Sequence, residues 1–424
     1  MRELIVPLAS REAADAERFG PKAANLARLG HAGLPTPGGF CVDAQAYREQ
    51  LAALGLGGTA IAVDSDDAAT ARRAALAMKL ALMDRPIAAT LAGPLLAAWR
   101  SLAYESAAPI VVRSSALVED RFGASFAGQF ESYLGLESEA EFVTAVRSCW
   151  AALWSTRVLR YMATHDASPA ETAMALLVQP LVNARVAGGA LSRTPEGEDM
   201  VINATWGLGS SIAQGEVVPE RIVVARDGRV RANASGWKFH RAGCVHGARG
   251  STRTVFVEPC LDREQATRLG WLLRKAEDTI GMPVEIEWAQ DETGFKLLQA
   301  RPLHLEPPRV PDEIWLKHPS LGGQPAGVGW ASGRARVVNC ECELSSVAPG
   351  DVLVTKVAGP ALGSVLPRVA GVVAELGGST SHLASLARER GIPMVLGVLD
   401  ATRRIPEGAQ VAVDGVAGVV RWIP

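Results

Sequence analysis

Residues 375–393 of the 424-residue chain read ELGGSTSHLASLARERGIP and place one histidine between a Gly-Gly turn and a short amphipathic segment. The residues just before it, GVVA at 371–374, form an apolar run that is typical of a buried strand. From His382 onward apolar residues recur at helical spacing, and Gly391 and Pro393 are residues that end a helix. The stretch therefore predicts a strand, a tight turn and a helix that begins at His382.

The position of His382 at a helix N-terminus favours a chemical role for its imidazole. Thr380 and Ser381 are good N-cap residues, while Gly377 and Gly378 let the backbone approach a ligand closely. The free N–H groups and the dipole of the first turn favour an anion and disfavour imidazolium, so we expect a neutral ring. A neutral imidazole is a nucleophile, and a phosphoryl group on it would lie against those N–H groups. A histidine that merely caps a helix is the alternative.

Composition and charge narrow the class of protein. The net charge of −2 argues against an electrostatic nucleic-acid-binding protein. No apolar run reaches the roughly 18 residues of a membrane span, and the first residues lack the pattern of a secretory signal. The six cysteines show no CxxC spacing, so we expect reduced thiols. The expectation is a cytoplasmic protein with no nucleic-acid or membrane partner.

Short apolar runs alternate with amphipathic segments along the chain, which predicts a mixed α/β (α+β) architecture. One segment, 142–161, places five large apolar residues on a single helical face, and these are Phe142, Val146, Trp150, Leu153 and Tyr161. A second helix is expected after Asp262, which matches a capping box with Gln265. Its buried stripe is expected to consist of Leu269, Leu272, Ala276 and Ile280.

A Pro- and Gly-rich passage at 305–327 predicts a linker. The stretch that follows, 328–424, contains short apolar runs, glycine turns and the helix of His382. Its length suits a small domain. The residues before the linker, 1–304, would then form a larger, separate part of the chain.

Two polar clusters in the first part of the chain suit phosphate binding. Pro21 marks a helix start with Lys22 beside it, so a cation would lie where a phosphate meets backbone N–H groups. Arg113 is expected at a strand end, ahead of a loop, GASFAGQ at 123–129, that is small enough to fold over phosphates. A solvated lysine and an ordinary loop are the alternatives.

A third cluster lies in the sequence VEIEWAQDETGFKLLQARP at 284–302. Glu285 and Glu287 share one face of a strand, and Gln299 and Arg301 share a face of the following strand. Carboxylate and amide oxygens suit Mg²⁺, and an arginine can clamp a phosphate. A salt-bridged surface hairpin is the alternative.

In this order the motifs resemble the phosphoenolpyruvate synthase and pyruvate phosphate dikinase superfamily, which includes the rifampin phosphotransferases. The resemblance covers nearly the whole chain and rests on GPKAANL (20–26), VRSSALVEDRFGASFAGQ (112–129), LLVQPLVNARVAGG (176–189), INATWGLGSSIAQGE (202–216), IEWAQDETGFKLLQARPL (286–303) and GGSTSHLASLARERGIPMVLGV (377–398). It implies an ATP-grasp domain at 1–304 with lobes at about 1–185 and 186–304. A swivelling phosphohistidine domain would follow the linker at 328–424.

The resemblance also implies ATP and Mg²⁺ as cofactors and assigns roles to single residues. His382 would be the phosphoryl carrier, with Thr380 and Ser381 beside it in the catalytic segment. The nucleotide would be bound by Lys22, Arg113, Ser125, Gly128, Gln129, Gln179, Glu285 and Arg301. Gln179 would lie near the adenine or ribose, and the metal would be bound by Glu287 and Gln299.

The activity that the resemblance implies is a dikinase-type phosphotransfer with paired acceptors. His382 would take the β-phosphoryl group of ATP, releasing AMP and phosphate, and pass it to a small-molecule hydroxyl or enol. We expect neither a pyruvate-binding barrel nor an antibiotic-binding insert in these 424 residues. The acceptor would then bind in a cleft between the domains or on a partner subunit. An ATP-grasp ligase that activates its acceptor for condensation, and a non-catalytic ATP-binding regulatory protein, are the alternatives.

Overall fold

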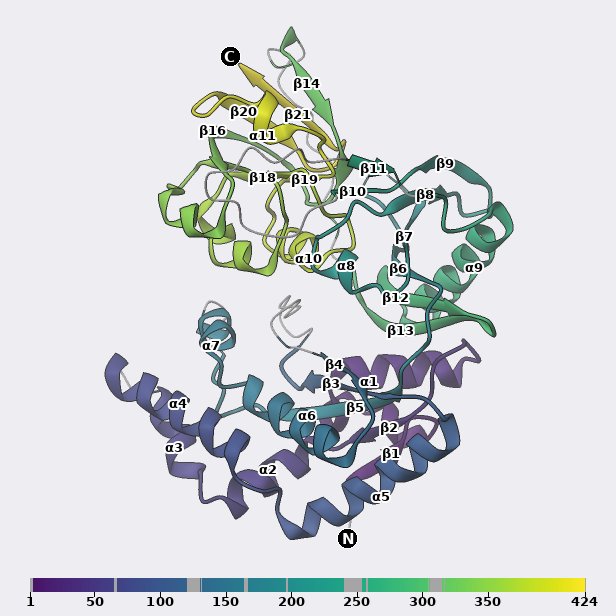
Figure 1. The fold of residues 1–424 in the computed structure, drawn as a ribbon, viewed down its shortest axis with the longest axis vertical. Helices are drawn as coiled ribbons and strands as arrows, with labels where there is room; N and C mark the ends of the chain where they lie inside the picture. Colours follow the sequence, from purple (N-terminus) through teal and green to yellow (C-terminus); the bar gives the residue numbers. More distant parts are fainter. Residues whose placement is uncertain are drawn as a thin grey trace. The chain divides into compact units, whose positions relative to one another are not determined.

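The computed structural model describes residues 3–64, 67–119, 130, 132–163, 167–195, 197–239, 254–256, 258–303, 305, 315 and 317–423. Helices and strands are mixed throughout, which confirms the α/β expectation (Figure 1). The chain divides into two compact units. Unit 1 comprises Met1–Asn183 and Lys296–Arg301, and unit 2 comprises Ala184–Phe295 and Pro302–Pro424.

Unit 1 is built on a five-stranded sheet in which every neighbouring pair is antiparallel. The strand order is β1 (Ile5–Pro7), β2 (Phe40–Val42), β5 (Met174–Pro180), β3 (Ile110–Ala116) and β4 (Ser132–Leu136). Its helices are α1 (Ala16–His31), α2 (Ala44–Ala53), α3 (Gly57–Ile61), α4 (Ala68–Asp84), α5 (Ala89–Ser106), α6 (Glu139–Ala152) and α7 (Thr156–Ala163), with short 3₁₀ turns at Arg11–Ala14 and Ala62–Asp64.

The segment expected as one helix over 142–161 is two helices, α6 and α7, separated at residues 153–155. The apolar stripe is nevertheless buried as expected, from Phe142 at 0% exposure to Tyr161 at 6%. Trp154 lies in the break, and its indole N–H donates to the Tyr47 hydroxyl at 2.8 Å. The chain therefore changes direction without exposing the large side chains that the helical spacing identified.

Unit 2 contains a sheet with the strand order β13, β12, β6, β7, β8, β9, in which β12, β6, β7, β8 and β9 pair antiparallel. Residues 296–301 of β13 belong to unit 1. These strands are β6 (Val186–Leu191), β7 (Met200–Trp206), β8 (Glu220–Val224), β9 (Val230–Ala234), β12 (Val284–Asp291) and β13 (Gly294–Pro302). Helix α9 (Arg263–Ile280) packs against β7, β8, β9 and β12. The predicted capping box of Asp262 and Gln265 is confirmed. Leu269, Leu272 and Ala276 are buried, while Ile280 is half-buried.

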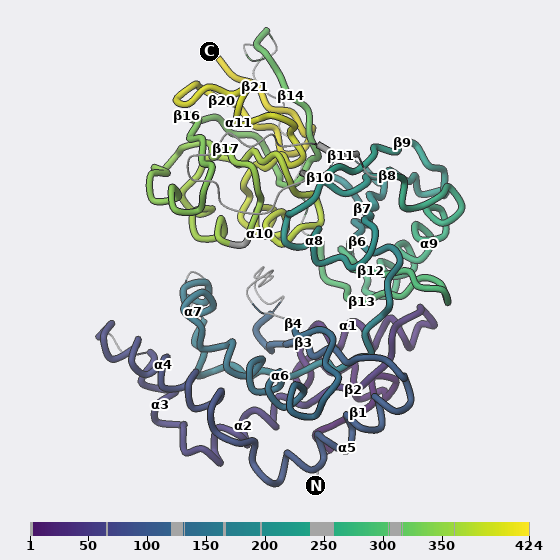
Figure 2. The backbone as a smooth tube through the Cα atoms, in the orientation of Figure 1, coloured from purple at the N-terminus to yellow at the C-terminus, as the bar shows by residue number. Residues whose placement is uncertain are grey.

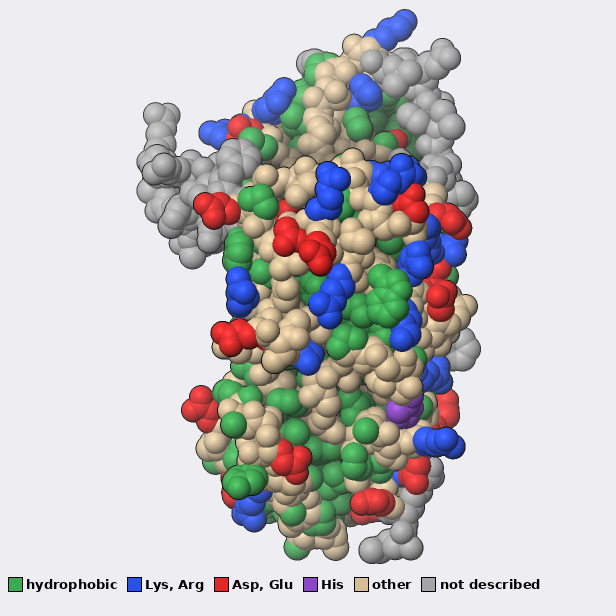
Figure 3. Space-filling model, turned by 90° about the vertical axis from the view of Figure 1, so that its right-hand side faces the viewer, with side chains coloured by type: hydrophobic (Ala, Val, Ile, Leu, Met, Phe, Trp, Pro, Cys, Tyr) green, Lys and Arg blue, Asp and Glu red, His purple; other side chains and the backbone are tan. Residues whose placement is uncertain are grey.

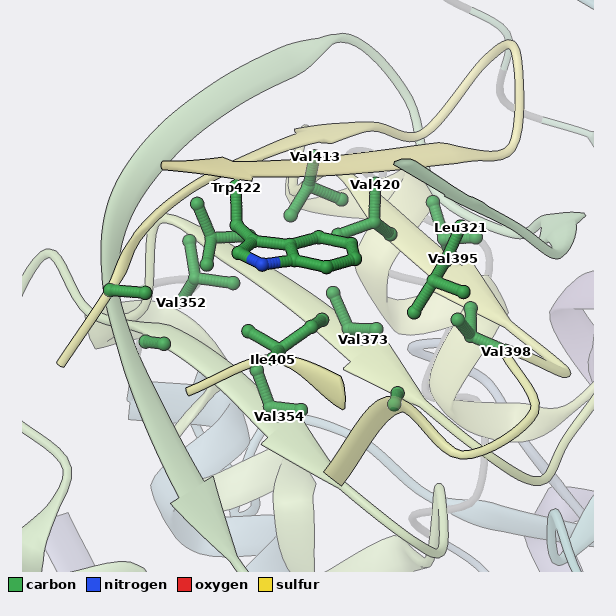
Figure 4. Close-up of a cluster of buried hydrophobic side chains, with 14 residues drawn as sticks. Leu321, Val352, Val354, Val373, Val395, Val398, Ile405, Val413, Val420 and Trp422 are labelled. Carbon is green, nitrogen blue, oxygen red and sulfur yellow. The ribbon is translucent and has the colours of Figure 1, made fainter. Parts of the chain in front are cut away.

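The rest of unit 2 forms an eight-stranded sheet in the order β14, β21, β20, β16, β17, β18, β19, β15. The strands are β14 (Ser320–Gly322), β15 (Gln324–Pro325), β16 (Trp330–Val338), β17 (Val352–Thr355), β18 (Gly371–Ala374), β19 (Met394–Leu396), β20 (Gln410–Asp414) and β21 (Val419–Ile423). Strands β16 to β19 are parallel. Figure 4 shows the Trp422 indole among Val352, Val373 and Val420 in the core of this sheet.

The remaining elements of unit 2 are short. They are α8 (Ser210–Ala213), α10 (His382–Glu389), α11 (Ala401–Arg404), 3₁₀ turns at Glu341–Ser346, Pro360–Ser364 and Leu366–Arg368, and a separate hairpin of β10 (Trp237–Phe239) and β11 (Thr254–Phe256). Figure 2 traces the backbone through these elements. Helix α10 is the element that carries His382.

Part of the passage at 305–327, expected as a linker, is strand. At 320–325 it forms β14, which pairs with β21, and β15, which pairs with β19. Gly323, between these two strands, lies so close to the end of β19 that an added Cβ would be 2.5 Å from the Leu396 carbonyl oxygen. The glycines and prolines of this part thus allow close strand contacts as well as turns.

Within the described ranges, no single helix has both the length and the apolar composition of a membrane span. Helices α4 and α5 meet these criteria only as a pair bent by 57°. Figure 3 shows acidic and basic side chains interspersed over one face of the molecule.

The five cysteines that the structure describes are free thiols. Burial raises the pKa of Cys41 to about 12. Burial, followed by the charge of Glu220, raises the pKa of Cys260 to about 12 as well. Both are therefore protonated and unreactive at neutral pH.

Candidate active site

The strand, turn and helix predicted around His382 are confirmed. His382 is the first residue of α10 and is half-buried. Ser381 is the N-cap, and its hydroxyl accepts from the Ala384 N–H at 3.3 Å. Gly377 has a φ of 108°, a conformation that side-chain-bearing residues rarely adopt, so the glycine is needed for this turn. The local sequence thus fixes the imidazole at the start of a helix.

A residue absent from the sequence-based predictions, Asn203 on β7, holds the segment just before His382. Its side-chain N–H₂ donates to the Ser379 hydroxyl at 2.9 Å and to the Thr380 hydroxyl at 3.2 Å. Asn203 is fully buried. No local signal in the sequence indicates this contact, because the partners lie 176 and 177 residues apart.

Glu285, predicted at the nucleotide, contacts α10 in the structure. Its carboxylate accepts from the Arg388 guanidinium at 2.7 Å and from the Ser385 hydroxyl at 3.1 Å. The Glu285 and Arg388 side chains are each 5% exposed. Ser385 and Arg388 follow His382 at one-turn spacing on the helix, but the sequence alone did not identify them as site residues.

In unit 1, Lys22 occupies the helix start that Pro21 indicated. Gly20 breaks α1 with a φ of 72°, and the helix resumes at Pro21. The Lys22 ammonium lies 2.8 Å from a carboxylate oxygen of Glu119 and donates to the Ser114 carbonyl at 3.2 Å. A cation is therefore fixed at the beginning of this helical segment.

Glu119 is a further residue that the sequence-based predictions missed. Its side chain is 2% exposed. Burial raises the pKa of Glu119, while the charges of Lys22 and Arg301 lower it. Its place in the run RSSALVED, shortly after a buried strand, is the only local signal that could have indicated it.

Arg113 and Gln299 lie together although they are 186 residues apart. The Arg113 guanidinium donates to the Gln299 side-chain oxygen at 3.4 Å. Arg113 is in the middle of β3 and not at its end, because the strand continues to Ala116. The neighbouring residue Ala300 accepts a hydrogen bond from the Asn25 side chain at 3.2 Å, which holds this stretch of β13 against α1.

The other predicted nucleotide residues are placed as follows. Arg301 is 7% exposed, on the same stretch of β13 as Gln299. Gln179 is buried on β5, and its side-chain N–H₂ donates to the Gly38 carbonyl at 3.4 Å. Ser125, Gly128 and Gln129 lie outside the described residues.

The two predicted metal ligands belong to different units. Glu287 is half-buried on β12 in unit 2, and Gln299 is 8% exposed in unit 1. In the part of the chain that the structure describes, no group of three or more His, Cys, Asp or Glu residues could hold a metal ion. Carboxylate and amide oxygens are ligand types that suit Mg²⁺, which commonly uses few protein ligands and takes its others from phosphates and water, so the metal assignment of these two residues stays a prediction.

Unit 1 thus gathers Lys22, Arg301 and the Arg113–Gln299 pair, with Glu119 among them. Cationic side chains of this kind suit a triphosphate. Unit 2 contributes a histidine at a helix start, where the backbone N–H groups favour an anion. Together these features support nucleotide binding in one unit and nucleophilic chemistry in the other.

Comparison with known proteins matches both parts of the chain. The family model described as pyruvate phosphate dikinase, AMP/ATP-binding domain matches residues 16–314. The model described as PEP-utilising enzyme, mobile domain matches residues 347–418, which include His382.

Curated relatives include proteins named phosphoenolpyruvate synthase. The one from Aeropyrum pernix is 31% identical and is matched over 95% of this chain and 56% of the relative. The one from Pyrococcus furiosus is 29% identical, over 96% of this chain and 57% of the relative. The one from Pseudomonas aeruginosa is 30% identical, over 100% and 58%. The chain therefore spans somewhat more than half the length of these relatives.

Proposed function

The chain belongs to the family of the pyruvate phosphate dikinase AMP/ATP-binding domain, and from this membership we propose that it is a dikinase-type phosphotransferase whose His382 accepts a phosphoryl group from ATP. The observation that carries the proposal is the position of His382. It begins α10 inside the segment matched by the mobile-domain model.

The nucleotide is assigned to the residues that the motifs identified. Lys22, Arg113 and Arg301 hold the phosphates, and Gln179 lies near the adenine or ribose. Glu287 and Gln299 bind Mg²⁺, which neutralises phosphate charge when it is bound. Catalysis of this kind depends mainly on positioning and on fixed charges.

The chemical step is an in-line displacement at the β-phosphorus. A neutral ring nitrogen of His382 forms a bond to the β-phosphorus. At the same time the bond between the β-phosphorus and the oxygen that bridges it to the α-phosphorus breaks. AMP leaves with that oxygen. The terminal phosphate is then lost to water or to inorganic phosphate, and the remaining phosphoryl group stays on the histidine.

The second half of the reaction passes this group to a small molecule. We propose a hydroxyl or an enol as the acceptor, since the relatives are named for phosphoenolpyruvate synthesis. The acceptor site is contributed by the chain itself or by a partner subunit. A cytoplasmic location, where ATP is abundant, belongs to the same proposal.

Labelling with ATP that carries radioactive phosphorus in the β position tests the first half-reaction. Wild type is expected to retain acid-labile label, and His382→Ala to retain less than about 1% of it, because the nucleophile is lost. His31→Ala is the matched control, because His31 is an exposed histidine of unit 1. Full labelling of His382→Ala would refute the proposal.

A further inference from the structure

The sheet β13-β12-β6-β7-β8-β9 contacts the His382 segment at two points, one on each side of His382 in the sequence. On one side, the buried Asn203 side chain donates to the hydroxyls of Ser379 and Thr380. On the other side, Glu285 on β12 accepts from Ser385 and Arg388 of α10. His382 lies between these two sets of partners in the sequence, so both constrain its position.

Arg388 connects the sheet to the backbone around His382. One guanidinium nitrogen donates to Glu285 at 2.7 Å, and the other donates to the carbonyls of Ser379 at 2.6 Å and Ala326 at 3.2 Å. The ion pair is 5% exposed on both sides. Removing one partner of such a pair leaves a buried charge without compensation, and this is costly. The pair therefore contributes to the docked position of α10, beside the hydrogen bonds of Asn203.

Two glycines, Gly189 and Gly378, allow the His382 segment to pack closely against the sheet and the residue that precedes β8. A Cβ added to Gly189 on β6 would lie 2.6 Å from the Thr380 Cβ. A Cβ added to Gly378 would lie 2.5 Å from a ring carbon of Pro219. Any larger side chain at either position would push the His382 segment away from the sheet.

We propose that Gly189, Asn203 and Glu285 form a docking site for the His382 segment, and that the Glu285–Arg388 ion pair is the latch that must open before His382 can leave it. The proposal rests on the proposed function, in which His382 carries a phosphoryl group away from the nucleotide. It gives Glu285 a positioning role in place of the nucleotide contact that the motif indicated. Glu287, two residues further along β12, keeps the metal assignment.

The latch is tested by single-molecule energy transfer in the full chain without nucleotide. Dyes are attached to cysteines introduced at Glu264 and Ser345, two exposed positions of unit 2, after Cys244, Cys340 and Cys342 are replaced by serine. Glu285→Gln keeps an oxygen for Ser385 but removes the charge that compensates Arg388. Glu292→Gln, an exposed change between β12 and β13, is the matched control.

We expect one high-transfer population for wild type and Glu292→Gln, and a second, low-transfer population for Glu285→Gln. The rate of histidine labelling by ATP should fall about 100-fold in Glu285→Gln, the order expected when a buried ion pair loses one partner. The double variant Glu285→Gln/Arg388→Gln carries no uncompensated charge at this pair. Its rate of histidine labelling should therefore be at least about tenfold higher than that of Glu285→Gln.

Two results would overturn the latch. One is a transfer distribution of Glu285→Gln that matches Glu292→Gln. The other is a double variant that takes label no faster than Glu285→Gln, because relief of the uncompensated Arg388 charge would then have had no effect. If Glu285→Gln opens while wild type takes no label from ATP, the proposed function fails and the latch stands, so the two failures are distinguishable.

Discussion

The contact between Lys22 and Glu119 gives the proposed phosphate site an internal anion. Lys22 is 17% exposed and Glu119 is 2% exposed, so neither charge is well solvated. A buried charge needs a partner, and the 2.8 Å ion pair supplies one. A triphosphate at Lys22 would therefore compete with a carboxylate that already neutralises the ammonium.

Glu287 is the single residue on which the metal assignment depends most. Replacing Glu287 by Ala removes a charged ligand for Mg²⁺, so AMP formation at limiting Mg²⁺ should fall by about 100-fold. The free energy of unfolding should change by less than about 1 kcal/mol, because Glu287 is only half-buried. Quenched-flow measurement of AMP, together with urea unfolding, checks both parts.

Glu292→Ala serves as the control, since Glu292 is exposed and lies just beyond β12. Its AMP formation should equal that of wild type. Wild-type turnover by Glu287→Ala at limiting Mg²⁺ would show that the metal is bound elsewhere.

The residue roles that the sequence predicts are those that depend only on neighbouring positions in the chain. Ser381 as N-cap and Pro21 as helix start follow from rules that involve a few neighbouring positions. Asn203 and Arg388 could not be predicted this way, because their partners lie 176 and 103 residues away. Which distant side chains meet depends on how the strands are paired, and no single segment contains that information.

Helix α1 depends on a glycine at its break. Gly20 has a φ of 72° and a ψ of 163°, and an added Cβ would collide with the Ser115 carbonyl oxygen on β3. Gly20→Ala should lower the free energy of unfolding by on the order of 2 kcal/mol and displace Lys22, which weakens ATP binding. Urea unfolding and nucleotide titration measure the two effects.

Gly30, in the same helix, is the control position for Gly20. A Cβ added to Gly30 would be no closer than 3.5 Å to Thr36. Gly30→Ala should be neutral or stabilising by up to about 1 kcal/mol, as alanine is the better helix former. Equal stabilities of the two alanine variants would contradict the role given to the break.

Elements with strong periodicity were the easiest to predict. The helix from Arg263 and the helix from His382 both appear where the capping and apolar patterns placed them. The division of 142–161 into α6 and α7 was missed, because the buried stripe continues across the break. The strands at 320–325 were missed because glycine and proline indicate turns, and only the pairing with β21 and β19 makes them strand.

At the scale of the whole molecule, the proposed cycle limits how often ATP can react without an acceptor. Each histidine that holds a phosphoryl group is blocked, so a polypeptide of these 424 residues should release one AMP per chain in a rapid burst and then slow down sharply. Rapid mixing with limiting protein and excess Mg-ATP measures the burst, and His382→Ala should show none.

Added pyruvate is expected to leave that burst unchanged. The two family matches, 16–314 and 347–418, account for most of these residues, and they are described as an AMP/ATP-binding domain and a mobile domain. Continuous AMP release with saturation by pyruvate would show that this polypeptide does contain an acceptor site for it.

The order of the large parts was predictable, because the motifs follow one another as they do in the family. The assignment of Lys296–Arg301 to unit 1 was not. A strand that continues from one unit into another has the same alternation of side chains as any other strand. The domain boundaries therefore remain a prediction, whereas the two compact units are observed.

Because residues 296–301 of β13 belong to unit 1, the order in which the chain is synthesised matters for its folding. Unit 1 needs residues 296–301, but the ribosome makes residues 184–295 first. At translation rates of about 5–20 residues per second, the first 183 residues wait roughly 10 s for this strand. During that interval Asn25 lacks the Ala300 carbonyl that it binds in the finished protein, and Arg113 lacks the Gln299 side chain. The nascent N-terminal part is therefore an incomplete fold that chaperones can recognise until the strand emerges.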